Sequence, residues 1–159
     1  EQSQAVHEQL MLNIVEELEV GSHIIADITY GSKDVPIVLF AALNFAEKLN
    51  APVATTLMCR GAIPSDHRLN TGMIGMHGSN ASNILATKCD LIIALGARFS
   101  DRVISDKKFI NNAKVIQIDI DPAEVNKNVK VDSFIIGDIK VALQRLMPLI
   151  EEKKNEEEK

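Results

Sequence analysis

Two kinds of hydrophobic spacing alternate along this chain. Apolar residues at helical spacing predict helices over residues 5–18, 34–49, 80–87 and 139–150. Between these stretches lie short, almost continuous apolar runs near residues 23–29, 52–57, 91–95, 114–120 and 133–136, which are typical of buried strands. Because parallel strands need crossover connections, the alternation predicts an α/β fold, a Rossmann-like doubly wound sheet of five parallel strands in three layers.

The length of the chain sets the domain organisation. Its 159 residues are enough for one full domain, which we expect to span residues 1–150. Residues 151–159 are almost all charged and are predicted to form a frayed helix end or a linker.

Composition and charge exclude several classes of protein. The 17 basic and 22 acidic side chains give a net charge of −5, so no basic excess suggests a nucleic-acid duplex as partner. Cys59 and Cys89 lie outside any CxxC motif, which excludes a disulfide scaffold and a cysteine-rich zinc site. No apolar run approaches the roughly 20 residues of a membrane span, and the first residues lack a signal-peptide pattern. We therefore expect a cytoplasmic protein without membrane contact.

Polar residues and glycines follow each predicted strand. In doubly wound sheets, ligands bind outside the carboxyl ends of the strands. The polar positions at these ends are 27–31, 55–56, 96–98, 119–121 and 137–138. The pattern predicts a ligand-binding edge.

The densest motif on that edge is a glycine-rich loop over residues 72–78. Three glycines in seven positions allow backbone N–H groups to approach a ligand, and Met73 and Met76 offer apolar cover for a flat ring. The spacing is not GxGxxG, so a flexible loop without ligand is the alternative.

Charged residues after two other strands favour a nucleotide. Arg98 and Arg102 follow the strand at 91–95, where an arginine fork would match a diphosphate; the alternative is a salt bridge to Asp101 or Asp106. Asp119 is placed to accept hydrogen bonds from ribose hydroxyls. Its alternative role is to cap the turn at 122–125, although Asp121 is the better candidate for that cap.

The residues do not predict catalysis or a metal site. His67 and His77 are ten positions apart, which matches no standard chelate spacing, and no GxSxG elbow is present. The motifs favour binding over chemistry.

Five ordered blocks match the pattern of a known family: residues 46–58, 61–67, 72–78, 89–99 and 115–124. Through these blocks, the chain from residue 46 to about residue 149 resembles the middle domain of acetolactate synthase (acetohydroxyacid synthase), a thiamine-diphosphate enzyme of branched-chain amino-acid biosynthesis. The resemblance implies that the domain binds FAD in a mainly structural role, and that thiamine diphosphate and magnesium belong to the full-length family. Carried over by motif, the implied contacts are, for the isoalloxazine and ribityl part, Thr56, Leu57, Met58, Ile74, Gly75, Met76, His77 and Gly78; for the diphosphate, Gly96, Ala97 and Arg98; and for the adenosine end, Asp119, Ile120, Gly137 and Asp138.

The chain departs from the family pattern at three places. Cys59 stands where the family usually has glycine, Ser100 stands where it usually has aspartate, and residues 26–33 replace a run of glycines. The last segment instead resembles the strand end of CRISPR-associated Rossmann-fold (CARF) sensors of cyclic oligoadenylates, through Asp27, Thr29, Gly31 and Lys33. The two resemblances suggest a chimera joined near residue 46, engineered or recombined; the alternative is a natural synthase fragment.

Three functions therefore remain open: a flavin-binding or dinucleotide-binding domain, a cyclic-oligoadenylate sensor, and a scaffold without ligand. The expected partner is a small-molecule nucleotide cofactor, and a homodimer is one assembly the sequence leaves open. The chain has no thiamine-diphosphate Gly-Asp-Gly…Asn-Asn motif, so by itself it should be inactive. Because Asp27 would oppose a diphosphate, we expect FAD binding by the isolated chain to be weak or absent.

Overall fold

The computed structural model describes residues 9, 11–14, 16, 24–28, 35–104 and 113–157. Apart from 3-10 turns, its elements are β1 (Ile24–Ile28), α2 (Val35–Leu49), β2 (Val53–Thr55), β3 (Asn70–Met73), α3 (Asn80–Lys88), β4 (Leu91–Leu95), β5 (Lys114–Asp119), β6 (Ser133–Ile136) and α4 (Ile139–Glu157).

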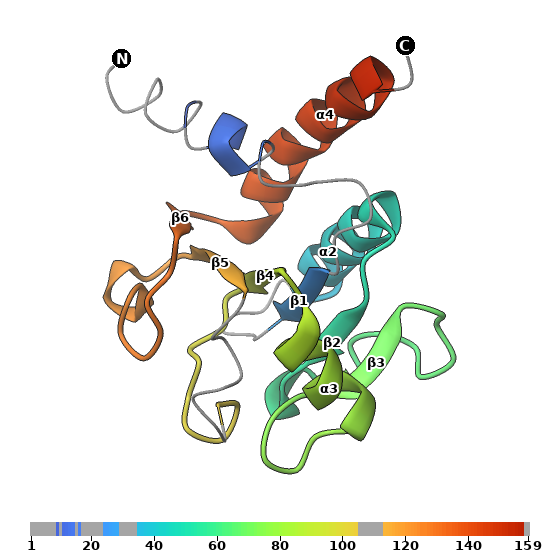
Figure 1. Ribbon diagram of the computed structural model, residues 1–159, viewed down its shortest axis with the longest axis vertical. Coiled ribbons are helices and arrows are strands. Elements are labelled where there is room, and N and C mark those ends of the chain that lie inside the picture. Colours follow the sequence, from blue (N-terminus) through green and yellow to red (C-terminus); the bar gives the residue numbers. More distant parts are fainter. Residues whose placement is uncertain are drawn as a thin grey trace.

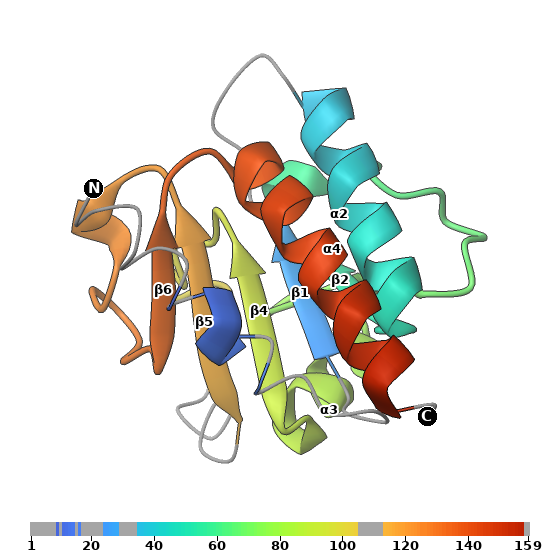
Figure 2. The ribbon, with the colours of Figure 1, turned by 90° about the horizontal axis from the view of Figure 1, so that it is seen from above.

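The strands form one sheet in the order β3-β2-β1-β4-β5-β6, and every neighbouring pair is parallel. Figure 2 shows the labelled strands β1, β4, β5 and β6 pointing the same way. This confirms the α/β, Rossmann-like class. The chain moves outward from β1 to β3 and then returns to β4, so the strand order reverses between β1 and β4, the place where such sheets bind ligands.

The predicted number of strands was wrong, because the described part of the chain forms a sheet of six strands and not five. The additional strand, β3, ends at Met73 and so overlaps the start of the glycine-rich loop predicted over residues 72–78. All four of its residues are half-buried, it sits at the edge of the sheet, and its pairing with β2 shifts register between Val53 and Ala54. Since an edge strand of this kind depends on ladder hydrogen bonds more than on an apolar face, its hydrophobic pattern is weak.

Apart from the helix predicted over residues 5–18, the other predicted elements are confirmed, with small changes at their ends. α2, α3 and the five apolar strands lie where the spacing placed them. α4 continues through Pro148 to Glu157, so residues 151–157 of the expected tail are helical. The helix predicted over residues 5–18 falls mostly outside the described residues.

Two hydrophobic cores lie on opposite faces of the sheet. On one face, α2 and α4 pack side by side (Figures 1 and 2), and their core includes Phe45, Ile93, Leu95, Ile118 and Leu146, each at most 1% exposed. On the other face, α3 and the loops cover a second core that includes Ala54, Ile92, Ala94, Phe99 and Val115. The helices, the sheet and this second cover make the three predicted layers.

Within the part of the chain that the structure describes, no helix has the length and apolar character needed to cross a bilayer.

Candidate functional site

The parallel topology brings every predicted site residue to one edge of the sheet. Each of the fifteen residues lies in, or directly after, the carboxyl end of a strand, and strands of a parallel sheet all end on the same side. In Figure 2 this is the edge toward which the arrowheads point. Their order along the edge follows the strands, from residues 74–78 after β3 to residues 137–138 after β6.

The segments after β4, β5 and β6 are joined directly. Gly96 N donates to Ile118 O at 2.8 Å, and Gly137 N donates to Asp119 O at 2.9 Å. The predicted diphosphate and adenosine residues therefore form one continuous group.

Arg98 projects from this group with its side chain 69% exposed. Its Nε lies 3.9 Å from Glu124 Oε1, and the same oxygen accepts a hydrogen bond from Lys127 Nζ at 2.9 Å. Arg98 is thus paired with Glu124 instead of the expected alternative Asp101, and Asp106 lies outside the described residues. Glu124 and Lys127 were not selected from the sequence; the one available signal was their place in the turn that follows a strand end.

The segments after β2 and β3 form a second group, which is tied to the first. Ile74 N donates to Thr55 O at 3.0 Å, and Met76 N donates to Arg102 O at 2.9 Å. The second of these bonds joins the loop after β3 to the loop after β4, although β2 and β1 lie between those strands. The two groups of predicted residues therefore meet at the carboxyl edge.

The predicted use of the glycine-rich loop was wrong in one respect. Its backbone N–H groups were expected to face a ligand, but several donate within the protein: Gly75 N to Asn83 Oδ1 at 3.0 Å and Gly78 N to Gly75 O at 2.8 Å, in addition to Met76 N. The Asn83 amide also donates to Gly75 O at 3.0 Å. Since these donors are occupied, the loop is a hydrogen-bonded turn.

The glycines of this loop are required by close backbone approach. Gly75 has a φ of 107°, and a Cβ there would collide with Arg102 O. A Cβ at Gly78 would lie 2.5 Å from Met73 O. These close backbone contacts explain why glycine occupies both positions, without any need for a bound ligand.

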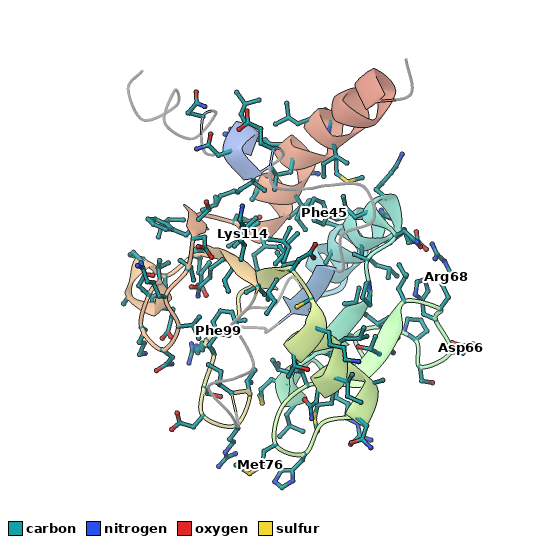
Figure 3. All side chains as sticks on the ribbon, viewed as in Figure 1. Phe45, Asp66, Arg68, Met76, Phe99 and Lys114 are labelled. Carbon is teal, nitrogen blue, oxygen red and sulfur yellow. The ribbon has the colours of Figure 1, made fainter. Side chains whose placement is uncertain are left out.

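The same edge exposes large apolar side chains. Leu57, Met58, Met76 and Ile120 are 58%, 77%, 60% and 72% exposed. Figure 3 shows Met76 at the outer tip of its loop. Single exposed apolar residues are ordinary, but four at one strand-end edge are typical of a surface that a ligand or a partner covers.

Carboxylates and a glycine complete the edge. Asp119 is 6% exposed and its Oδ1 accepts from Asp121 N at 2.9 Å, while Asp121 accepts from Ala123 N and caps the following 3-10 turn as expected. Asp138 accepts from Val141 N at 3.0 Å at the start of α4.

Gly137 has no positive φ, and a Cβ there would meet nothing within 4 Å. Neither a positive φ nor a close contact requires glycine at position 137.

Two departures from the family pattern are easily accommodated. Cys59 is buried and is not among the residues with positive φ, so a side chain in place of glycine brings no strain there. Ser100 is exposed and contributes its carbonyl oxygen, which accepts from Val103 N and Ile104 N. Neither change disrupts the edge.

The described residues offer no alternative chemistry. Burial, followed by the charge of Asp90, raises the pKa of the Cys89 thiol to about 12, which opposes formation of a nucleophilic thiolate. His67 Nε2 lies 3.2 Å from Glu47 Oε1, and no cluster of three metal-ligating side chains occurs in the described ranges. Of the sensor motif, only Asp27 is described, in β1 between Ala54 and Ala94; residues 29, 31 and 33 lie outside the described part.

Comparison with known proteins assigns the family. The family model for the central domain of thiamine pyrophosphate enzymes matches residues 40–146. The chain belongs to this family. It is 53% identical over 106 residues to a probable acetolactate synthase large subunit of Methanocaldococcus jannaschii, covering 66% of this chain and 18% of that protein. It is 46% identical over 155 residues to the acetolactate synthase large subunit of Lactococcus lactis, covering 94% and 26%.

A solved structure supports the same assignment. An X-ray structure described as a thiamin diphosphate-dependent enzyme from Mycobacterium smegmatis superposes with a TM-score of 0.67 at 28% identity, covering 90% of this chain and 27% of that one. The chain thus spans between about a fifth and a quarter of the length of these relatives.

The matches confirm the resemblance drawn from residues 46–149. The Lactococcus alignment covers 94% of the central-domain chain, so it also crosses the suggested junction near residue 46. Neither the chimera nor the oligoadenylate sensor draws support from these comparisons.

Proposed function

We propose that this central domain is the FAD-binding domain of an acetolactate synthase large subunit and that it is not catalytic by itself. The observation that carries the proposal is the 46% identity to the Lactococcus large subunit across nearly the whole chain. In a complete enzyme of this kind, thiamine diphosphate with magnesium supplies the carbanion chemistry. The residues of this chain would bind and orient the flavin.

The carboxyl edge fits a flavin dinucleotide in its polarity. The exposed side chains of Leu57, Met58 and Met76 offer apolar contact to an isoalloxazine ring at the ends of β2 and β3. Because the backbone N–H groups of Gly75, Met76 and Gly78 already donate within the protein, side chains would make most of this contact. The open space above Gly137 lets an adenosine group approach the end of β6.

The charges on the edge favour the diphosphate near Arg98. Arg98 and Lys127 together carry two positive charges, and Glu124 between them neutralises one. One positive charge remains beside the turn after β4, where the exposed guanidinium can meet phosphate oxygens.

A flavin titration tests the proposed function and the effect of Asp27. Quenching of FAD fluorescence should show weak or absent binding by the unmutated chain and tighter binding by Asp27→Gly. The substitution removes the negative charge of a β1 residue that pairs with Ala94 of β4, and the strand order reverses between these two strands. Asp27→Asn is the control that removes the charge and keeps the size. No FAD binding by any of the three proteins would refute the proposal.

Arg98→Ala should weaken FAD binding in the Asp27→Gly background about 10- to 100-fold, the usual effect of losing a charge-assisted hydrogen bond. The FAD affinity of Arg98→Lys should lie between that of Arg98→Ala and that of the Asp27→Gly protein with Arg98 intact, since lysine keeps the charge but loses the planar fork. Arg145→Ala removes the same charge from an exposed position on α4 and should leave the affinity unchanged. Equal losses from the Arg98→Ala and Arg145→Ala variants would show that the diphosphate does not lie at Arg98.

A further inference from the structure

A buried amide links the two halves of the proposed diphosphate and adenosine site. Gln117 lies in β5 and is 0% exposed. Its Nε2 donates to Ala97 O at 3.0 Å and to Glu124 O at 3.4 Å. Ala97 belongs to the turn after β4 and Glu124 to the turn after β5, so one side chain holds both turns.

The orientation of this amide follows from its surroundings. Both neighbours of Nε2 are carbonyl oxygens, so the NH₂ group must face them. The other amide atom, Oε1, is buried and accepts no hydrogen bond from the residues that the structure describes. A buried acceptor without a partner is unfavourable. Gln117 is therefore a poor choice for stability alone, compared with an apolar side chain of similar length.

The segment that Gln117 holds has an unusual backbone. Asn128 Nδ2 donates to Arg98 O at 2.9 Å, so the consecutive carbonyls of Ala97 and Arg98 are both fixed from β5 and the β5–β6 connection. The next residue, Phe99, has a φ of 45°, which is rare for a bulky side chain. Such a conformation persists only where the surroundings determine it.

We propose that Gln117 is a positioning residue for the flavin site. Its amide sets the turn that carries Arg98 against the turn that begins at Asp121, and thereby fixes the spacing between the diphosphate and adenosine ends of the site. Gln117 itself touches no ligand. The role rests on the proposed FAD binding, but the coupling of the two turns by Gln117 can be measured without FAD.

Amide hydrogen exchange tests the structural part. Gln117→Met removes the donor and keeps the length of the side chain, whereas Gln117→His keeps a ring N–H donor. In Gln117→Met, exchange at Gly96, Glu124 and Val125 should be about tenfold faster or more, since the backbone bonds of these amides lie in the two turns. Ile116→Val, buried on the opposite face of β5, is the control for general loosening and should not change these sites. Unchanged exchange in Gln117→Met would overturn the proposal whatever FAD does.

FAD titration tests the functional part, again in the Asp27→Gly background. The FAD dissociation constant should rise about tenfold in Gln117→Met and stay within about threefold in Gln117→His and Ile116→Val. Faster exchange with unchanged FAD affinity would show a structural role only and would overturn the proposal. If no form of the protein binds FAD, the proposed function fails and the positioning role at a flavin site fails with it, while the exchange rates still decide whether Gln117 couples the two turns.

Discussion

Gly75→Ala should lower the free energy of unfolding by about 2–4 kcal/mol, because it combines an unfavourable backbone conformation with a collision. The φ of 107° disfavours any side chain, and the new Cβ would strike Arg102 O, the acceptor of the Met76 N–H bond. Relief of the collision must separate the loop after β3 from the loop after β4. We therefore also expect the variant to lose FAD affinity.

Gly61→Ala is the matched control for Gly75→Ala. Gly61 has a φ of 89°, but a Cβ there would meet no atom within 4 Å. Only the unfavourable backbone conformation contributes, so the free energy of unfolding should fall by about 1–2 kcal/mol. Urea unfolding of the two variants and the unmutated chain measures both values. Equal losses would show that the contact between Gly75 and Arg102 does not matter for stability.

Phe99→Ala should lower the free energy of unfolding by about 3–5 kcal/mol, because it leaves a cavity in the core beneath α3 and the loops. Phe99 is 3% exposed, and Figure 3 shows it on the face of the sheet opposite α2 and α4. Phe99→Gly leaves a slightly larger cavity but removes the penalty of positive φ. We expect it to be about 1 kcal/mol more stable than Phe99→Ala.

Alanine and glycine substitutions at Phe45 should have the opposite order of stability. It is 1% exposed and lies within α2, where glycine is less favourable than alanine by about 1 kcal/mol. Phe45→Gly should therefore be less stable than Phe45→Ala, which reverses the order expected at Phe99. Chemical denaturation of the four variants tests this. The same order at both positions would contradict the backbone argument for Phe99.

Most of the layered fold could be predicted from the hydrophobic pattern alone. β4 and β5 are buried on both faces of the sheet, so their residues form nearly continuous apolar runs that spacing alone detects. α2 and α3 were found because their apolar residues recur at helical spacing. The edge of the site also followed from sequence, because the carboxyl ends of parallel strands must lie together.

Which polar groups are free to bind a ligand depends on contacts between residues far apart in the chain. The glycines at 75 and 78 suggested available donors, but Gly75 N donates to Asn83 Oδ1 and Gly78 N donates to Gly75 O, and sequence spacing cannot show such partners. The strand β3 was hidden because ladder bonds to β2 stabilise it without an apolar pattern. Gln117 was missed because its bonds join it to Ala97, 20 positions away, and to Glu124 across a turn. A glutamine inside an apolar strand indicates a buried partner, but only the packing of β4 against β5 determines that this partner is the turn carrying Arg98.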